Sequence, residues 1–341
     1  MSENPTILAI VLNYRTADLT IKAVEYALRE MTDLNGQVTI VDNDSGDGSY
    51  ERIMTAAQTR GWLASGRVQV IKAARNGGYG AGNNIGIRAG MQNGQDADFV
   101  YVLNSDAYPD EGAIHALMAH LQNNPPHGQA GSFIHGPDGA AHSTAFRFPS
   151  IISEFEAAAC TGVFTRLFAR HVVSLPIPIE TETVDWLAGA SLMIRREVLE
   201  QVGLFDEGFF LYFEETDLCR RVQLAGWATA YVRESSVTHI GSVSTGMKRW
   251  DRVPQYWFDS RLRYFTKAHG RVYAGCATLA HIAGALVYRL RCLVSNKPRV
   301  DPKYFLRDLI WHAICAPFRR RRSGTGAIDR CPQAGSMKDA A

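Results

Sequence analysis

The chain has 341 residues, a formal net charge of +2, 46% hydrophobic residues and 21% charged residues. These values are typical of a globular protein with one large domain or two small ones. The six cysteines show no C-x-x-C or other metal-ligand spacing, so we expect reduced thiols in a cytosolic compartment. The N-terminus has no basic region before its short apolar run, which predicts a buried strand rather than a signal peptide.

The first part of the chain alternates between strand and helix patterns. Strands are predicted at residues 6–12, 37–41, 68–72 and 99–103. Helices are predicted at residues 17–31, 50–59, 84–93 and 112–123. This alternation indicates an α/β fold with a mostly parallel sheet and right-handed crossovers. Ligands of such sheets gather at the carboxyl ends of the strands, where Asn13, Asp42, Asn76 and Asp106 fall.

The second half of the chain is less regular. Residues 151–170 form an apolar helical stretch, and residues 184–194 read as a single strand. Two more helices are predicted at 196–202 and 217–225, and two more strands at 229–232 and 237–240. The last twenty residues are polar and rich in Gly and Ala, which predicts disorder.

The segment 205–221, FDEGFFLYFEETDLCRR, places carboxylates directly after an aromatic run. Carboxylates beside so much apolar surface are costly unless they are paired, bound to metal or used in chemistry. Asp217 and Arg221 have the spacing of a favourable helical pair. Glu215 projects about 100° away from the Asp217 face, so we expect it to be available to a ligand. The alternative is a helix N-terminus whose acids, Glu214 among them, suit the helix dipole.

Three polar segments follow predicted strands. In residues 42–48, DNDSGDG, Asp42 can accept a hydrogen bond from a base or ribose, or the segment can be a turn with Asx caps. In residues 75–84, RNGGYGAGNN, the glycines do not follow the dinucleotide fingerprint; helix-start N–H groups there can meet phosphate, or the segment is a flexible loop. Residues 104–106, Asn-Ser-Asp, can hold a divalent cation that bridges a diphosphate, or form an ordinary turn.

His239 follows the last predicted strand. A lone histidine is more often structural than a ligand, so a role in a site depends on whether His239 converges with Asp106. An NAD-dependent enzyme is disfavoured, because the residues after the first strand, VLNYRTADLT, contain no glycine fingerprint.

Six segments, in this order, resemble those of glycosyltransferase family 2 and its rhamnosyltransferase-like branch in bacterial surface polysaccharide synthesis. They read ILAIVLNY, TIVDNDSGDGS, RNGGYGAGNNIGI, VYVLNSDAYPD, VDWLAGASLMIRREVLEQVGLFDEGFFLYFEETDLCRRVQLAGW and VTHIGSVST. Together they span about residues 6–265. The resemblance implies a GT-A fold, a Rossmann-like and mostly parallel central sheet flanked by helices, here with a C-terminal helical extension.

By this resemblance, the chain is an inverting, metal-dependent glycosyltransferase that uses a dTDP- or UDP-sugar and Mg²⁺ or Mn²⁺. Glu215, with Glu214 beside it, stands at the implied general base. Asp106 and His239 are the implied metal ligands, whereas Asn104 stands where the family often has an Asp, which leaves direct ligation by Asn104 open. The implied donor-binding residues are Asn13, Asp42, Asn43, Asn76, Gly78, Asn83, Asn104, Ser105, Asp106, Trp186 and Gly189.

The chemistry of sugar transfer needs these residue types. An acceptor hydroxyl needs a carboxylate to take its proton, and the leaving diphosphate gathers charge that a cation and helix-start amides offset. Membrane-embedded processive members of the family carry Q-x-x-R-W, whereas residues 246–250 read GMKRW. We therefore do not expect a processive synthase.

The C-terminal part is basic. Residues 271–322 carry a charge of +9 and residues 323–341 a charge of zero, so subtraction from +2 leaves −7 for residues 1–270. A basic segment on an acidic body suggests an anionic partner, lipid or nucleic acid. Nucleic acid is disfavoured, because no recognised module surrounds these arginines.

Two apolar stretches lie in this basic part. The stretch 272–290 is interrupted by His and Arg and is short for a membrane span. The stretch 304–318 is amphipathic and runs into Arg319–Arg322, which fits a helix lying in an anionic bilayer surface. The alternative is helices that pack on the catalytic domain and end in an ordinary basic tail.

We therefore expect a catalytic domain at residues 1–268, basic helices at 269–322 and a disordered tail at 323–341. The expected function is transfer of a sugar to a glycan or lipid-linked acceptor in cell-surface polysaccharide synthesis, with L-rhamnose from dTDP-rhamnose as the candidate donor. The expected location is the cytoplasm, peripheral to the inner face of the cell membrane. The alternative is a catalytically inactive nucleotide-sugar-binding partner in a polysaccharide assembly complex.

Overall fold

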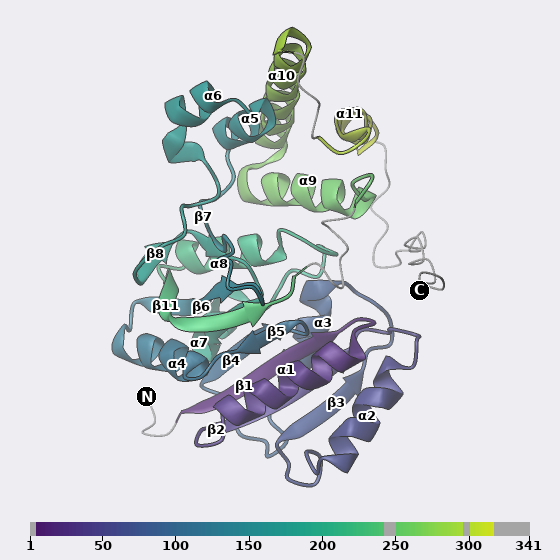
Figure 1. Ribbon diagram of the computed structural model, residues 1–341, viewed down its shortest axis with the longest axis vertical. Helices are drawn as coiled ribbons and strands as arrows, with labels where there is room; N and C mark the ends of the chain where they lie inside the picture. The colour runs from purple at the N-terminus through teal and green to yellow at the C-terminus, as the bar shows by residue number, and fades with distance from the viewer. Residues whose placement is uncertain (1–4, 242–249, 296–300, 317–341) are drawn as a thin grey trace.

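The computed structural model describes residues 5–241, 250–295 and 301–316 (Figure 1). The strands are β1 (Thr6–Asn13), β2 (Asn35–Asp42), β3 (Val68–Lys72), β4 (Phe99–Asn104), β5 (Ala107–Pro109), β6 (His127–His135), β7 (Ala145–Phe146), β8 (Glu182–Val184), β9 (Trp186–Leu187), β10 (Ser191–Arg195) and β11 (Ala228–His239). The helices are α1 (Ala17–Glu30), α2 (Ser49–Thr59), α3 (Tyr79–Ala89), α4 (Ala113–Asn123), α5 (Ile151–Ala159), α6 (Gly162–Leu167), α7 (Arg196–Val202), α8 (Glu214–Leu224), α9 (Gln255–His269), α10 (Arg271–Ser295) and α11 (Phe305–Cys315).

One mixed sheet organises the catalytic part, in the order β3-β2-β1-β4-β10-β6-β11-β5, with β8 also paired to β11. Strands β3, β2, β1 and β4 run parallel to one another, as the alternation of the first part predicts. Strand β10 is antiparallel to both β4 and β6. The sheet is therefore a parallel half joined to a mixed half, and the ends of β1, β2 and β4 all lie at one edge.

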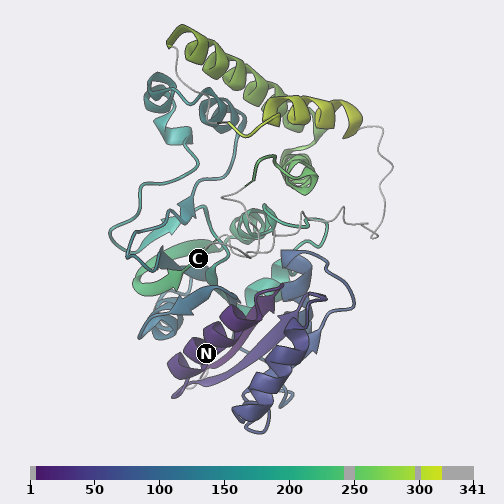
Figure 2. The same cartoon turned by 45° about the vertical axis from the view of Figure 1, so that its right-hand side comes forward.

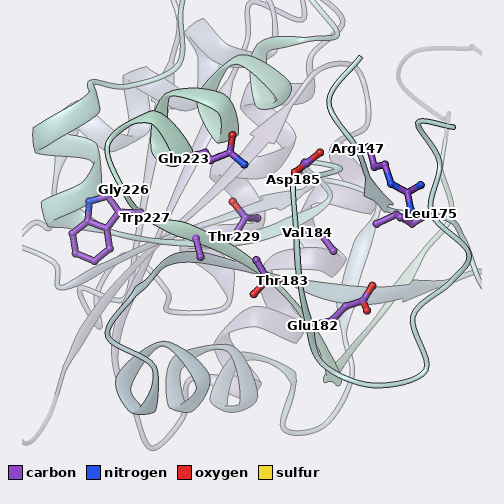
Figure 3. A pocket seen from close by; sticks show the side chains of 11 residues that line it. Arg147, Leu175, Glu182, Thr183, Val184, Asp185, Gln223, Gly226, Trp227 and Thr229 are labelled. Carbon is purple, nitrogen blue, oxygen red and sulfur yellow. The ribbon is translucent and has the colours of Figure 1, made fainter. Parts of the chain in front are cut away.

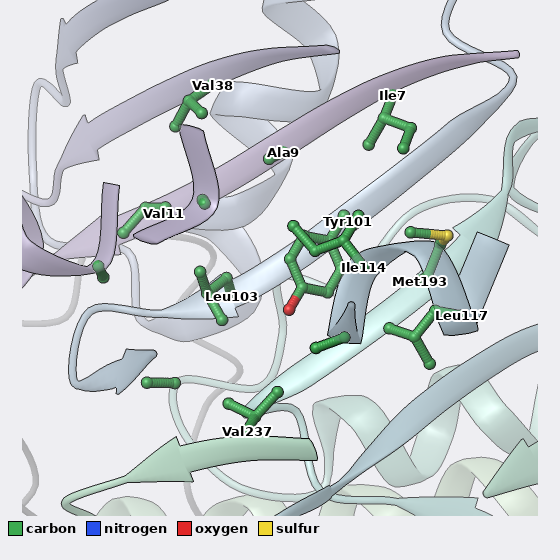
Figure 4. Close-up of a cluster of buried hydrophobic side chains, with 14 of the residues drawn as sticks. Ile7, Ala9, Val11, Val38, Tyr101, Leu103, Ile114, Leu117, Met193 and Val237 are labelled. Carbon is green, nitrogen blue, oxygen red and sulfur yellow. The ribbon is translucent and has the colours of Figure 1, made fainter. Parts of the chain in front are cut away.

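Both faces of the central strands are covered. On β1, Ile7, Ala9 and Val11 point into the core cluster that contains α1 and α4, as Figure 4 shows for this face. Leu8 and Ile10 point into the opposite cluster, which contains residues of α7 and α8. Burial on both faces explains why β1 reads as a continuous apolar run instead of an alternating one.

Helix α3 begins at Tyr79, five residues before the predicted start. Glycines lower helix propensity, and for that reason the sequence favoured a loop here. In the structure, Gly82 and Gly86 lie inside α3 and face β1, where an added Cβ would come within 2.4 Å of Leu12 and 2.8 Å of Ile10. The glycines thus allow α3 to pack closely on the sheet.

Three other predictions were wrong in their boundaries. The single strand expected at 184–194 is three short strands, β8, β9 and β10. The helical stretch 151–170 breaks at Cys160, which has a positive φ of 42°. The two strands expected near the end of the catalytic part form one strand, β11, with a register shift between Val232 and Ser236.

The C-terminal helices lie at the end of the molecule away from β2 and β3 (Figure 2). A separate apolar cluster, which includes Phe209, Phe265 and Ala277, joins them to the segment before α8. Beneath that cluster, Glu154 of α5 accepts hydrogen bonds from Arg261 of α9 at 2.8 Å and pairs with His281 of α10 at 2.7 Å. Burial disfavours the charge of Glu154, but these two partners hold its pKa down to about 2.

Candidate active site

The end of β1 is joined to the end of β2 by buried polar contacts. Asn13 Nδ2 donates to Asp42 Oδ1 at 2.7 Å, and the Ser45 hydroxyl donates to the same oxygen at 2.6 Å. Asp42 is buried and also accepts from the Ser45 backbone N–H. A pocket of about 220 Å³ opens beside it, lined by Asp42, Gly46, Gly48, Ser49, Tyr50, Glu51 and Lys72. Asp42 therefore lies where the sequence predicts it, at the wall of a pocket beyond a strand end.

Asn43 and Asn76 shape the turn that precedes α3. Asn43 Nδ2 donates to Asn76 Oδ1 at 3.0 Å and to the Gly78 carbonyl at 3.1 Å. Asn76 Oδ1 also accepts from the Gly78 N–H at 3.0 Å. Gly78 has a φ of 90°, and an added Cβ would lie 1.9 Å from the Phe210 carbonyl oxygen. The turn thus presses directly against the segment that leads to the predicted catalytic acids.

Tyr79 and Asn83 occupy the first turn of α3. The Tyr79 hydroxyl donates to the Gly189 carbonyl at 2.6 Å, which joins α3 to the turn between β9 and β10. Asn83 Nδ2 donates to the Tyr79 carbonyl at 3.0 Å. Tyr79 lies in the motif RNGGYGAGNN, but the sequence predicts no role for it, because no sequence pattern reveals a contact with a residue 110 positions away.

Asp106 and His239 converge, as the sequence analysis required for a role of the histidine. His239 Nε2 lies 3.1 Å from Asp106 Oδ1, and the Gly241 N–H donates to Asp106 Oδ2 at 3.1 Å. Asn104 Nδ2 lies 3.5 Å from the same histidine nitrogen. Pairing of the end of β11 with β5 carries His239 to this position, since His239 lies opposite Ala107 in that register.

Glu214 and Glu215 begin α8. Burial and the neighbouring Glu215 raise the pKa of Glu214 well above its usual range, and burial raises the pKa of Glu215 to about 7. The two residues before them, Tyr212 and Phe213, both have a φ of 69° although neither is glycine. Such backbone strain persists only where the surrounding structure enforces it, and it is typical of functional sites.

Asp217, one turn further along α8, has a different role. Arg221 Nε donates to Asp217 Oδ2 at 2.9 Å, as the helical spacing predicts, and Lys267 of α9 lies 2.7 Å from Asp217 Oδ1. Lys267 also bonds to Asp206 at 2.8 Å. Asp217 is therefore a fully paired anchor that fixes the start of α8 against α9.

Tyr79 joins helix α3, which packs beside the predicted base segment, to the turn that meets the predicted metal segment. At the residue after Tyr79, an added Cβ on Gly80 would lie 3.6 Å from Glu214 Cβ. The Tyr79 hydroxyl bonds to the Gly189 carbonyl, and the neighbouring Ala190 carbonyl accepts from the Asn104 N–H at 3.0 Å. Burial raises the pKa of Tyr79, and the charges of Glu215, Glu214 and Asp106 raise it further. The predicted base segment and the predicted metal segment thus both adjoin the elements that this contact joins.

Several site residues hold buried oxygen atoms with no hydrogen-bond partner. Within the described part of the chain, these atoms are Oδ1 of Asn43, Asn83 and Asn104 and Oε2 of Glu214 and Glu215. Buried polar groups are nearly always satisfied, so each exception needs an explanation. All five atoms accept hydrogen bonds or bind cations, which fits a ligand rich in hydroxyl and N–H donors.

Two predicted donor residues have structural partners. Ser105 Oγ lies 3.1 Å from Thr16 Oγ1, which ties the 104–106 turn to the start of α1. The Trp186 ring stacks on Phe146 with centroids 4.2 Å apart, and its Nε1 donates to the Arg147 carbonyl. Trp186 therefore packs from β9 onto β7, half-buried, so these contacts support its structural role.

The residues at the end of β4 fit a divalent cation. Asp106 offers a carboxylate, His239 an imidazole and Asn104 an unpartnered amide oxygen, all ligand types that Mn²⁺ or Mg²⁺ sites use. The described residues contain no group of three or more His, Cys, Asp or Glu side chains placed to hold a metal. A cation here would consequently need oxygens from the substrate to complete its coordination.

Another pocket, larger than the one beside Asp42, lies away from the predicted site residues. It has a volume of about 550 Å³ and opens between β8, the start of β11 and the end of α8 (Figure 3). Thr229 of its lining lies near the beginning of β11, whereas His239 lies at the end of that strand. None of the predicted catalytic or metal residues lines it, so we do not assign the reaction to this pocket.

A mixed sheet of this order, with carboxylates and amides gathered beyond its parallel strands, has the GT-A architecture. The chain belongs to glycosyltransferase family 2: the family model described as "Glycosyltransferase like family 2" matches residues 5–271. The resemblance inferred from the six motifs is thereby confirmed, and the protein is a glycosyltransferase.

Relatives of known name are similar over the catalytic part. An N-acetylglucosaminyl-diphospho-decaprenol L-rhamnosyltransferase of Mycobacterium tuberculosis is 32% identical over 216 residues, which are 61% of this chain and 68% of that protein. The rhamnosyltransferase WbbL of Escherichia coli is 23% identical over 164 residues, 48% of this chain and 60% of that protein.

Solved structures share the fold. The mannosyltransferase PcManGT of Pyrobaculum calidifontis, in complex with GDP-Man and Mn²⁺, superposes with a TM-score of 0.57 at 14% identity, over 94% of this chain and 82% of that one. GalNAc-T7 with UDP, GalNAc and Mn²⁺ also gives 0.57 at 14% identity, over 92% of this chain and 58% of that one. At these identities the likeness shows the GT-A fold alone.

Proposed function

We propose that the protein is an inverting, metal-dependent glycosyltransferase that moves a sugar from a nucleoside diphosphate donor to a glycan or lipid-linked acceptor. The observation that carries the proposal is the set of five unpartnered buried oxygens on Asn43, Asn83, Asn104, Glu214 and Glu215. They lie at the ends of β2 and β4 and on helices α3 and α8, which the Asn43–Gly78 and Tyr79–Gly189 contacts hold together. Each is an amide or carboxyl oxygen that can accept a hydrogen bond. A sugar nucleotide supplies the hydroxyl donors that such atoms need.

Glu215 is the proposed general base. Its carboxylate takes the proton of the acceptor hydroxyl while that oxygen forms a bond to the anomeric carbon of the donor. The bond between the anomeric carbon and the diphosphate oxygen breaks, and its electron pair leaves with the diphosphate. A pKa of about 7 suits this task, because the group is partly ionised near neutral pH and still basic enough to accept a proton.

Asp106, His239 and Asn104 are the residues that would hold a divalent cation. When bound, the cation would offset the negative charge of the diphosphate. Asp106 is held in place by the Gly241 N–H and by His239, so its carboxylate is oriented before a ligand arrives. Structural neighbours solved with Mn²⁺ support a cation in this fold.

A rhamnose donor, dTDP-rhamnose, is the proposed substrate. Its support is that two relatives of this chain, from Mycobacterium tuberculosis and Escherichia coli, are named as rhamnosyltransferases. The name of the Mycobacterium tuberculosis protein describes a lipid-diphosphate acceptor, which supports a lipid-linked acceptor here. We propose accordingly that the protein works in the cytoplasm at the inner face of the cell membrane.

The test is a donor screen on the purified chain. Nucleoside diphosphate release is measured with dTDP-rhamnose and with UDP- and GDP-sugars, for the natural protein and for Glu215→Gln. Release that needs a divalent cation and is lost in Glu215→Gln, while donor binding is kept, supports the proposal. Donor binding without release by the natural protein would favour the alternative of a catalytically inactive nucleotide-sugar-binding partner. Full activity of Glu215→Gln would refute the base assignment.

A further inference from the structure

The outer face of α10 is apolar along the length of the helix. The exposed residues of α10, apart from its first and last, carry no charge. They are Val272, Gly275, Cys276, Leu279, Ala283, Leu286, Leu290, Leu293 and Val294. The exposed fraction is 84% for Val272, 67% for Leu279 and 80% for Leu293. A surface helix normally turns polar residues to water. This face therefore carries apolar residues where a surface helix normally has polar ones, and no other part of the described chain covers it.

The inner face of α10 is already occupied. Gly284 lies so close to α5 that an added Cβ would be 2.3 Å from the Phe155 carbonyl oxygen. His281 Nδ1 lies 2.7 Å from Glu154 Oε2 on the same side. The helix cannot turn its apolar stripe inward without breaking this buried polar contact. For the same reason, although α10 is long and apolar enough to cross a membrane, it is better suited to lie on one.

Neighbouring helices extend the apolar surface. Val163 and Leu167 of α6 are exposed, and so are Ile310, Trp311 and Ile314 of α11. Helix α5 contacts both α6 and α10, and α11 contacts α10. Figures 1 and 2 both place these helices at the end of the molecule away from β2 and β3. Exposed tryptophan beside aliphatic residues is typical of a membrane–water interface.

We call residues 151–171, 271–295 and 301–316 the helical cap. Its carboxylates all have partners: Glu154 with Arg261, Glu156 with Thr165, Asp301 with Arg289, and Asp308 with Arg252. Its exposed cations are Arg166, Arg170, Arg271, Lys303 and Arg307. The solvent-facing surface of the cap therefore carries apolar and basic groups together. Three of its four acids pair with arginine, and the fourth, Glu156, is buried and accepts from Thr165. The sequence adds Arg319–Arg322 just beyond the described residues.

We propose that the helical cap docks on an anionic lipid bilayer, with α10 lying in the plane of the interface. Apolar area lowers the free energy of insertion, and basic side chains attract anionic lipid headgroups. The inference deepens the proposed function by naming the surface that would bring the enzyme to a lipid-linked acceptor. It names a partner that the catalytic residues do not contact, so it can fail independently of the sugar-transfer proposal.

A second copy of the chain is the competing occupant. The stripe repeats every seven residues at 272, 279, 286 and 293, a spacing that also serves helix pairing. Paired helices normally place charges of opposite sign beside the stripe, whereas α10 carries arginines and no acidic residue that could pair with them on a second copy. The apolar surface also continues onto α6 and α11, which is broader than one helix contact needs. These features favour a bilayer.

The experiment is vesicle flotation of the full chain, without donor or acceptor. Vesicles contain phosphatidylcholine alone or with phosphatidylglycerol. The test variant is Leu286→Gln with Leu293→Gln, on the exposed stripe. The matched control is Ile179→Gln, which changes an apolar residue that is 88% exposed outside the cap. A third variant, Arg166→Gln with Arg170→Gln, removes exposed charge and leaves the stripe intact.

We expect the stripe variant to lower the partition coefficient about ten-fold on both vesicle types, whereas Ile179→Gln leaves it unchanged. The arginine variant should lose only the added affinity for phosphatidylglycerol. Unchanged thermal unfolding and donor turnover show that each variant is folded. Flotation that is equal for the stripe variant and the natural chain would overturn the proposal. So would a stripe variant whose solution mass falls from dimer to monomer while flotation persists, which would identify the second copy as the occupant.

Discussion

The hydroxyl of Tyr79 donates a hydrogen bond of 2.6 Å to the backbone carbonyl of Gly189. The contact joins the first turn of α3 to the turn between β9 and β10. Gly189 is needed for it, because an added Cβ would lie 2.9 Å from the tyrosine hydroxyl. Since α3 packs beside Glu214 and the Ala190 carbonyl accepts from the Asn104 N–H, the bond ties the predicted base segment to the predicted metal segment.

Replacement of Tyr79 by Phe tests this role. The ring stays and only the hydroxyl is lost, so we expect a loss of kcat/KM of about five-fold, the equivalent of one hydrogen bond of roughly 1 kcal/mol. Tyr26→Phe, on α1, is the matched control and should leave activity unchanged. Steady-state nucleotide release measures both. Equal activity of Tyr79→Phe and the natural enzyme would show that the hydroxyl does not position the site.

Gly78 permits the closest backbone approach in the site. An added Cβ at Gly78 would lie 1.9 Å from the Phe210 carbonyl, and its φ is 90°. Gly90 has a φ of 65° but open space around it. Both glycines combine a positive φ with a ψ near 180°, so Gly90→Ala should cost only the backbone strain, about 1 to 3 kcal/mol of unfolding free energy, whereas Gly78→Ala should cost at least about 2 kcal/mol more. Denaturant unfolding compares the two; equal losses would mean that the contact with Phe210 is not rigid.

The parallel half of the sheet could be predicted from the sequence because its central strands, β1 and β4, are buried apolar runs that end in polar residues. Strand β3 matches its predicted residues 68–72, and β1 extends the predicted strand by Asn13 alone. Helix α3 could not be bounded, because its glycines are selected by contact with β1 and not by helix propensity. Local patterns carry no information about such packing.

The candidate site likewise contains residues that the sequence predicts and contacts that it does not predict. The positions of Asp42, Asp106 and Glu215 follow from motifs at strand or helix ends. The convergence of His239 with Asp106 depends on pairing of β11 with β5, across more than 130 residues. The contact of Tyr79 is equally non-local. Sequence patterns thus find the residues that carry chemistry, whereas the residues that hold them in place appear only in three dimensions.

The pH dependence of transfer should follow Glu215. Burial raises the pKa of Glu215 to about 7, and only the ionised form can accept a proton. We therefore expect kcat/KM to rise about ten-fold per pH unit below pH 7 and to level off above it. Burial and the charge of Glu215 also raise the pKa of Glu214 well above its usual range. A rate that falls as pH rises from 6 would contradict the assignment.

The raised pKa of Glu215 also predicts that the stability of the fold decreases as pH rises, whereas the activity increases. A carboxyl whose folded-state pKa lies above its unfolded value stabilises the fold at low pH, and this contribution is lost as pH rises through about 7. Glu215→Gln removes the buried charge, so it should raise the unfolding free energy at pH 8 by about 1 to 3 kcal/mol and change it little at pH 5. Thermal unfolding at both pH values measures the difference. A stabilisation that is equal at both pH values would arise from packing and not from ionisation.

Asn104 offers the sharpest test of the proposed cation site. Its Oδ1 is buried without a partner, and its Nδ2 lies 3.5 Å from His239 Nε2. Asn104→Asp would place a second carboxylate beside Asp106, and hard cations bind carboxylates more strongly than amide oxygens. We expect about ten-fold tighter Mn²⁺ binding, measured by calorimetry without donor, and a lower Mn²⁺ requirement for transfer. The control is Asn83→Asp, which adds the same charge at a buried amide on helix α3 instead of strand β4. It should not tighten Mn²⁺ binding. If both variants tighten it equally, the gain reflects the general field of the site and not ligation by residue 104.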